Sequence, residues 1–276
     1  MEWTDKAILL TVAKAGKRTL ILEVLTQHHG RCRCVTSFTG GSSPMLLPGS
    51  FLEMTCSIEG FDKPLLATLS RITGGIIAEK SDDIGLVVLS TAKDLLVSLL
   101  PLEQPAPDVY GVMRSMMSSL VRNDGRWPMH YAMWEFALLC EIGKVEGVQR
   151  CRPAFRHGET IYMSPRSGAL HTREEAGAFL DKMQDVPGFL LGGKTINMVS
   201  VRQAMELNQI LLERFALPET QGGLPALRAK LEWMIQRTRE LPPEAQEDET
   251  EIDEEARRNR IEAMRPLMVA SRSMGA

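Results

Sequence analysis

The sequence predicts an α+β protein in which a small β-barrel precedes a helical bundle. Between residues 7 and 72, five short segments rich in apolar and β-branched residues alternate with turn-forming residues. From residue 84 onward, the apolar residues instead follow the 3.6-residue period of a helix. The 276 residues are 44% hydrophobic, which is enough for the cores of one large or two to three small domains.

The first region, residues 1–80, is predicted to form a five-stranded barrel of the OB type, because such barrels have five short strands. Gly16 marks the first turn, and Gly30 is placed for a left-handed backbone in the hairpin QHHGR. The Gly-, Ser- and Pro-rich stretch 39–48 is expected to be a loop. Strands are expected at 7–12, 19–26, 32–38, 50–59 and 66–72.

The second region, residues 81–241, is predicted to be a helical domain with a small inserted module around 146–170. The module is expected to hold a strand at 161–164 and a turn at 165–168. Ser200 is expected to cap the helix that begins at Val201, and Gly188 to end the helix that begins after Thr172. Helices are expected at 84–100, 108–121, 129–142, 172–188, 201–217 and 225–241. Residues 242–276 are predicted to be a mostly disordered acidic tail with one helix at 254–268.

Charge and cysteine usage limit the class of protein. The net charge of −3 excludes a uniformly basic nucleic-acid coat, so nucleic-acid binding requires a local basic patch. Residues 1–80 carry nine Lys and Arg against seven Asp and Glu, a local net charge of +2. Five cysteines with no secretory signal predict reduced thiols in the cytoplasm. No apolar run reaches the roughly 18 residues of a membrane span, so no membrane partner is expected.

The turns and strands of the predicted barrel carry a group of cations. In one interpretation they contact phosphates along a groove, which requires only positive charge at regular spacing. In the other they are ordinary solvated charges at turns. Aromatic residues that could stack on bases are scarce, which favours binding through the backbone. The candidate DNA-binding residues are Lys14, Lys17, Arg18, Arg31 and Arg33.

Two other residue groups have ligand-type or catalytic-type chemistry. His28, His29, Cys32 and Cys34 could hold a metal only in a strained geometry, because the histidines lie in the turn and the cysteines on the following strand. We therefore predict no metal and no cofactor. His157, His171 and Ser164 suggest a hydrolase, but no supporting catalytic motif accompanies them, and no Walker or GxGxxG motif is present. We predict no catalytic residues and no enzymatic activity.

The central helices carry arginines beside apolar residues. An acidic partner peptide that ends in an apolar residue needs a cation for its carboxylates and an apolar pocket for its last side chain. The alternative is a core stripe with arginines extending to its rim. The candidate residues for a partner peptide are Arg114, Arg122, Arg126, Met117 and Trp127.

Six segments, in this order along the chain, resemble one bacterial family. They are MEW-x-D-x-AI, TLILEVLTQHHGR, LLPG, MWEFALLCEIG, IYMSPRSGAL and VPGFLLGG. Over residues 1–240 the chain thereby resembles the DNA repair protein RecO family of recombination mediators.

The resemblance implies a function as well as a fold. It implies an N-terminal OB fold, a helical bundle and a small module that carries zinc in some members. It further implies binding and annealing of single- and double-stranded DNA. The implied partners are RecR, with which such proteins load RecA, and the acidic C-terminal tail of single-stranded-DNA-binding protein. The implied location is the cytoplasm, at the nucleoid.

The chain departs from this family pattern in three places. The segment SFTGGSSPM at 37–45 has no base, where the family is usually rich in Arg and Lys. Cys151 stands alone, so the module is expected to be a degenerate zinc-ribbon-like element without zinc. The acidic run 244–255 is either a solvated tail or a segment that folds back on the barrel cations. These departures support an alternative, a protein-interaction module that has lost most DNA binding.

Overall fold

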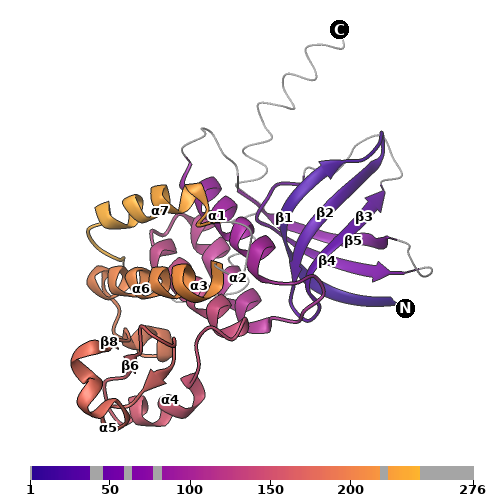
Figure 1. The fold of residues 1–276 in the computed structure, drawn as a ribbon. Helices are drawn as coiled ribbons and strands as arrows, with labels where there is room; N and C mark the ends of the chain where they lie inside the picture. Colours follow the sequence, from indigo (N-terminus) through magenta and orange to yellow (C-terminus); the bar gives the residue numbers. More distant parts are fainter. Residues whose placement is uncertain (1, 38–45, 59–63, 77–82, 218–222, 243–276) are drawn as a thin grey trace.

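The computed structural model describes residues 2–37, 46–58, 64–76, 83–217 and 223–242. A closed barrel forms one end of the molecule, a helical bundle forms the middle, and a small mixed module lies beyond the bundle (Figure 1). No helix in these ranges is long and apolar enough to cross a membrane. The predicted tail helix at 254–268 lies outside the described residues.

The barrel has five strands, as predicted, and its strand order is β1-β2-β3-β5-β4. Antiparallel pairs join all neighbours except β3 and β5, which pair in parallel at Cys34–Leu65 and Val35–Leu66. This is the five-stranded OB-type barrel that the sequence predicted. The strands are β1 (Glu2–Lys14), β2 (Thr19–Thr26), β3 (Gly30–Ser37), β4 (Ser50–Ser57) and β5 (Leu65–Gly74).

The first strand is much longer than the predicted 7–12, because it pairs with two partners. Its first part, Glu2–Ile8, pairs with β4, and Ala7–Lys14 pairs with β2. A register shift between Leu9 and Thr11 bends the strand between these two pairings, as a β-bulge does. The strand therefore closes the barrel.

The helical bundle begins with three helices, α1 (Ile84–Leu99), α2 (Pro107–Arg122) and α3 (Trp127–Glu141). It ends with α6 (Met198–Leu211) and α7 (Ala226–Arg237), and a π-helical turn η3 (Leu212–Ala216) extends α6. Helix α3 starts two residues before its predicted start, because Pro128 fits the first turn, where no amide donor is needed. Helix α6 starts at Met198, because Asn197 and not Ser200 is its N-cap.

The small module comprises the elements between α3 and α6. The short pairs Tyr162–His171 and Tyr162–Asp185 join β6, β7 and β8 into a three-stranded sheet. The predicted helix at 172–188 is wrong: α5 ends at Ala176, because Gly177 adopts φ 49° and ψ −127°, which only glycine adopts readily. The elements are α4 (Val148–Arg156), β6 (Tyr162–Met163), β7 (Leu170–His171), α5 (Arg173–Ala176), η1 (Gly177–Lys182), β8 (Gln184–Asp185) and η2 (Gly188–Leu191).

The end of the barrel that holds the β2–β3 turn is fixed to the bundle. Ile8 and Leu25, on the outer face of the barrel, belong to the same buried apolar cluster as the helices. Gly30 has φ 71°, and a side chain there would overlap the backbone oxygen of Gln104. The amide of Glu103 donates to the carbonyl of Arg31 at 2.8 Å. The barrel and the loop between α1 and α2 therefore meet backbone to backbone.

A buried ion pair joins α7 to α3. Arg228 and Glu135 are each 1% exposed, and Arg228 donates through Nε and Nη2 to the two carboxylate oxygens at 2.8 and 3.1 Å. Tyr131 donates a further hydrogen bond to Glu135 at 2.7 Å. Burial alone raises the pKa of Tyr131, and the charge of Glu135 raises it further, so the phenol remains a donor. This network fixes the position of α7.

Candidate nucleic-acid interface and partner pocket

The β1–β2 turn presents the main group of exposed cations on the barrel. Lys14 ends β1, and Lys17 and Arg18 follow in the turn; all three are exposed. The turn is held by its backbone, because the amides of Ala15 and Gly16 both donate to the carbonyl of Thr19, at 3.0 and 3.2 Å. Within the described residues these cations form no ion pair. We call these three residues the cationic turn.

Arg33 lies on β3 on the same side of the barrel wall as its paired residue Glu23, and it is exposed. The pairing of Thr19 with Ser37 places Arg33 four residues from the level of the cationic turn. At about 3.3 Å per strand residue, this separation is roughly 13 Å. That distance is close to two phosphate spacings at the ~6–7 Å of a single strand, so one strand could reach both.

Arg31 differs from the other predicted DNA-binding residues, because it is buried. Its guanidinium pairs with the carboxylate of Glu23 and donates through Nε and Nη2 to the carbonyl of Leu100 at 3.1 and 3.0 Å. Its hydrogen-bonding capacity is thus used to join the barrel to the end of α1. The sequence did not reveal this, because its two partners lie 8 and 69 residues away.

The β2–β3 turn contains a compact polar cluster around a buried carboxylate. The side chain of Asp5 is 1% exposed and accepts hydrogen bonds from the amides of Lys6 and His28, both at 2.8 Å. It also meets Nδ1 of His28 and Nδ1 of His29, both at 2.9 Å. The ring of His29 stacks on Trp3 with centroids 3.8 Å apart. We call Trp3, Asp5, His28 and His29 the Asp5 cluster.

Burial alone raises the pKa of Asp5, but the hydrogen bonds from His29 and His28 outweigh it, and the pKa is lowered overall. The carboxylate is therefore ionised at neutral pH, and each imidazole donates from Nδ1. The amide of His28 and the Nδ1 atoms of both histidines are thus hydrogen-bonded to Asp5 within the cluster. It supports the turn and does not present a cationic surface.

The two cysteines next to this turn are unsuited to metal binding. Cys32 and Cys34 point into the barrel core, at 1% and 0% exposure, while the histidines are bound to Asp5. Burial raises the pKa of Cys32 to about 11, so its thiol keeps its proton, whereas zinc binds thiolates. In the small module, Cys151 is fully buried. Within the described ranges, no group of three or more His, Cys, Asp or Glu side chains is arranged so that it could hold a metal ion.

The residues predicted to hold a partner peptide divide between the buried core of the bundle and half-buried positions around it, and none of them lines the pocket described below. Met117 is fully buried and Trp127 is 7% exposed, so both belong to the core of the bundle. Arg122 lies 3.7 Å from Asp124, and Arg126 donates to the sulfur of Met129 at 3.6 Å. Arg114 lies near Tyr110. Burial raises the pKa of Tyr110 to about 12, and the positive charge of Arg114 partly opposes this rise. This set therefore comprises two core residues and three half-buried arginines around them.

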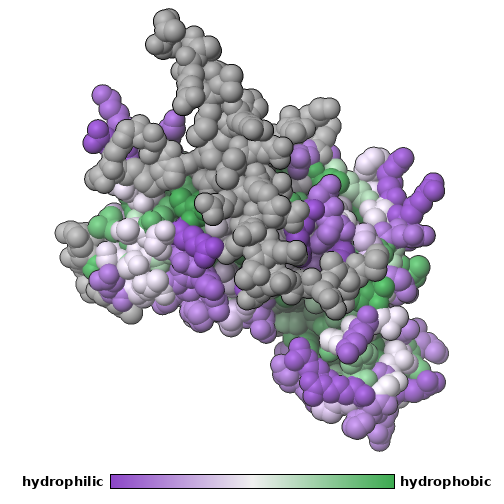
Figure 2. All heavy atoms as spheres, turned by 180° about the vertical axis from the view of Figure 1, so that it is seen from behind, coloured by the Kyte–Doolittle hydropathy of each residue, from purple (hydrophilic) through white to green (hydrophobic). Residues whose placement is uncertain are grey.

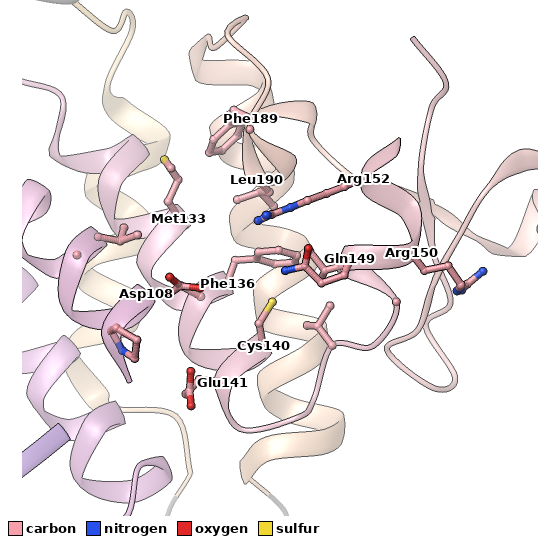
Figure 3. A pocket seen from close by; sticks show the side chains of 18 residues that line it. Asp108, Met133, Phe136, Cys140, Glu141, Gln149, Arg150, Arg152, Phe189 and Leu190 are labelled. Atoms are coloured by element: carbon pink, nitrogen blue, oxygen red, sulfur yellow. The ribbon is translucent and has the colours of Figure 1, made fainter. Parts of the chain in front are cut away.

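A pocket of about 860 Å³ lies elsewhere, between the bundle and the small module. Its floor comes from α3, whose stripe of Met133, Phe136, Ala137 and Cys140 faces α4 and η2 (Figure 3). Phe189 and Leu190 from η2 close the other side. The helical spacing of that α3 stripe was visible in the sequence and was the available signal for this pocket. Figure 2 shows the molecule from behind. Hydrophobic residues are visible at the junction of the module and the bundle, whereas the outer surface of the module is mostly hydrophilic.

The charges around this pocket are unevenly placed. The guanidinium of Arg152 extends into the pocket between Leu190 and Gln149 (Figure 3), and its buried Nε has no hydrogen-bond partner among the described residues. Asp108 and Glu141 lie at the opposite side. Burial raises the pKa of Cys140 to about 12, with Arg152 opposing the rise, so this thiol is a neutral part of the wall. An arginine with an unpartnered Nε beside apolar walls suits a ligand with a carboxylate and an apolar group.

The predicted hydrolase residues remain separate. His157 is exposed after α4, His171 is half-buried on β7, and Ser164 is buried at the end of β6. In the part of the chain that the structure describes, none of the three hydrogen-bonds to another, and Ser164 accepts the amide of Arg166 at 3.4 Å. No nucleophile–base pair is formed by them.

Comparison with known proteins gives a consistent result. No family model matches the chain. It is 30% identical over 242 residues to the DNA repair protein RecO of Cereibacter sphaeroides (strain ATCC 17029 / ATH 2.4.9), which covers 86% of this chain and 99% of that protein. It is 26% identical over 248 residues to the DNA repair protein RecO of Rhodospirillum rubrum, covering 86% and 97%. The protein of the same name from Roseobacter denitrificans is 29% identical over 196 residues, covering 70% and 80%.

Proposed function

The chain belongs to the RecO family of DNA repair proteins, and from this premise we propose that it is a recombination mediator that makes and breaks no covalent bond. It binds single- and double-stranded DNA, anneals complementary strands, and with RecR helps load RecA onto strands coated by single-stranded-DNA-binding protein. Its place of action is the bacterial cytoplasm, at the nucleoid.

The observation that carries the DNA-binding part is the cationic turn together with Arg33. Three exposed cations lie at the β1–β2 turn of an OB-type barrel and a fourth, Arg33, on the adjacent strand β3, and none of them forms an ion pair within the described residues. Such a surface neutralises phosphates without reading bases. It therefore suits a protein that must hold strands of any sequence, and reduced repulsion between two bound strands favours annealing.

The test is a fluorescence anisotropy titration of a labelled single-stranded oligonucleotide across a salt series. Four neutralised phosphates predict a log–log slope of about −3, at roughly −0.7 per phosphate on a single strand. Reversing the cationic turn with Lys14→Glu, Lys17→Glu and Arg18→Glu together is expected to weaken binding at least about tenfold at low salt and to flatten the slope. Lys182→Glu on the small module is the matched control and should leave binding unchanged.

The alternative is a protein-interaction module of the same fold that has lost most DNA binding. The base-free segment at 37–45 and the overall charge of −3 favour it. Absence of binding by the unmodified protein even at low salt would establish this alternative and refute the mediator proposal.

A second binding function is supported by the pocket between α3, α4 and η2. We propose that it receives the acidic C-terminal tail of single-stranded-DNA-binding protein, with Arg152 facing the terminal carboxylate and Phe136 and Phe189 holding the last side chain. A labelled acidic peptide with an apolar C-terminal residue should bind the protein, and Arg152→Gln should weaken it at least about tenfold, the loss of one charge-assisted contact. Arg156→Gln, an exposed arginine on the same helix, is the control. Equal binding by both variants would exclude this pocket.

A further inference from the structure

We infer that the outward face of α7 is a second contact for single-stranded DNA, in which Trp233 stacks on a base while Arg237 and neighbouring cations attract phosphates. The inference rests on the proposed DNA binding and adds to it a site remote from the barrel. Its basis is the combination of an exposed indole, a fixed helix and a cationic surrounding.

Trp233 is the exception among the four tryptophans of the chain. Its relative exposure is 56%, whereas Trp127 and Trp134 are 7% and 0% exposed, and Trp3 is stacked on His29. Exposing a tryptophan leaves a large apolar area in water, which is unfavourable. The surface of α7 thus offers a flat ring that is not packed into the core.

The ring stands on a rigid support. Leu231 and Ile235, on the inward side of α7, are fully buried, and Arg228 forms the buried ion pair with Glu135. At the other end of the helix, Arg202 of α6 donates to the carbonyl of Thr238 at 2.7 Å. A helix fixed at both ends presents its outward side chains without a large ordering cost, which favours stacking.

The charge around the ring is complementary to a nucleic-acid backbone. The guanidinium carbon of Arg237 lies 4.7 Å from the ring centroid of Trp233, so a cation already occupies one side of the indole. Lys230 precedes the tryptophan by one helical turn, and the exposed Arg239 follows α7. Glu232 on this helix and the exposed Glu240 after it oppose these cations, because the charge of Arg228 is already paired with Glu135. Three cations, Lys230, Arg237 and Arg239, against two acids leave a local net charge of +1.

The described part of the barrel, in contrast, offers little for bases to stack on. Among its described aromatic residues, Trp3 stacks on His29 and Phe51 packs against the bundle core. A base can reach an indole only when it is unpaired, because bases in a duplex are stacked within the helix. Proteins that bind single strands without sequence preference commonly combine a cationic groove with such aromatic residues, on which the bases stack. The face of α7 therefore favours single strands over duplexes.

The experiment measures affinity and tryptophan emission on the full chain with an oligothymidylate and with a duplex of equal length. Trp233→Ala is expected to weaken single-strand binding at least about fivefold, the lower end of what one stacked base contributes, and to remove most of the quenching of emission by the oligothymidylate. Duplex affinity should change less than twofold. Trp233→Phe should restore most of the single-strand affinity, because phenylalanine also stacks. Phe179→Ala is the matched control, since Phe179 is 61% exposed on the small module.

Each outcome decides between distinct statements. If the unmodified protein binds no DNA, the proposed function fails. If the charge reversal of the cationic turn weakens binding but Trp233→Ala does not, the α7 inference alone is overturned. Equal losses for single strands and duplexes would also overturn it, because they indicate a structural role. So would quenching that depends on protein concentration without DNA, because it would assign this face to a second copy of the chain.

Discussion

The two turns at opposite ends of β2 both carry ionisable residues, but those residues have opposite roles. The β1–β2 turn leaves Lys14, Lys17 and Arg18 exposed, while the β2–β3 turn commits His28 and His29 to the buried carboxylate of Asp5. Both turns carry ionisable residues, so composition alone does not separate them. The difference lies in whether a buried acceptor stands within reach. Charges with buried partners support the fold, and charges without partners remain for a ligand.

The largest expected effect is on Arg31, the cation that belongs to the fold. Arg31→Ala removes the partner of Glu23 and leaves that carboxylate buried and uncompensated, which costs about 3–5 kcal/mol. Urea unfolding followed by circular dichroism measures the loss. Arg33→Ala, two residues along the same strand and exposed, should change the free energy of unfolding by no more than about 0.5 kcal/mol. Equal losses in the free energy of unfolding for the two substitutions would contradict the distinction between cations with buried partners and cations without them.

A smaller loss is expected for the centre of the Asp5 cluster. Asp5→Ala leaves the amide of His28 and two imidazoles without their acceptor, which costs about 1–3 kcal/mol in the free energy of unfolding. Glu2→Ala, an exposed acid on the same strand, serves as the control and should be close to neutral. A neutral Asp5→Ala would mean that water satisfies these donors equally well.

The lowered pKa of Asp5 predicts that the stability of the fold depends on pH in the acidic range. Because the folded state lowers the pKa of Asp5, its contribution is complete above the ordinary carboxyl pKa of about 4 and is lost as the pH falls through the folded value. Urea midpoints measured between about pH 5 and 3 should therefore fall more steeply for the unmodified protein than for Asp5→Ala. Parallel curves would show that other carboxylates account for the acid sensitivity.

The smallest effect on stability, and the sharpest contrast, is expected at the cationic turn. Arg18→Ala should change the free energy of unfolding by less than about 0.5 kcal/mol, because the side chain has no partner within the described residues. The same substitution should reduce the salt slope of single-strand binding by about 0.7. A clear loss of stability without a change in the salt slope of DNA binding would mean that Arg18, like Arg31, supports the fold and does not contact DNA.

The barrel was largely predictable because its signals are local. Turn glycines and the apolar, β-branched residues of segments such as 19–26 located the hairpins, and the count of five strands together with the family resemblance indicated the OB type. The ends of β1 were not predictable, because its pairing with β4 involves residues about fifty positions away. Helix α4 was missed because Pro153 lies inside it, and a proline within a helix removes an amide donor and usually indicates a break.

The candidate sites were predictable only where they are contiguous in sequence. Lys14, Lys17 and Arg18 lie on one turn and were found together. The pocket joins α2, α3, α4 and η2, so Arg152 meets Phe136 and Phe189 only after folding. Burial of a charge is likewise a property of distant partners, as the bond from Arg31 to the carbonyl of Leu100 illustrates.

Strand β2 has a further consequence for how partners are spaced. Its eight residues span roughly 26 Å at about 3.3 Å per residue. One end carries the cationic turn, and the other is locked to the loop after α1 through Gly30 and Gln104. The strand therefore fixes a distance. A nucleic acid bound at the cationic turn would stay at a constant separation from a partner bound by the helical bundle. Any tether between those two ligands must be long enough to span that interval.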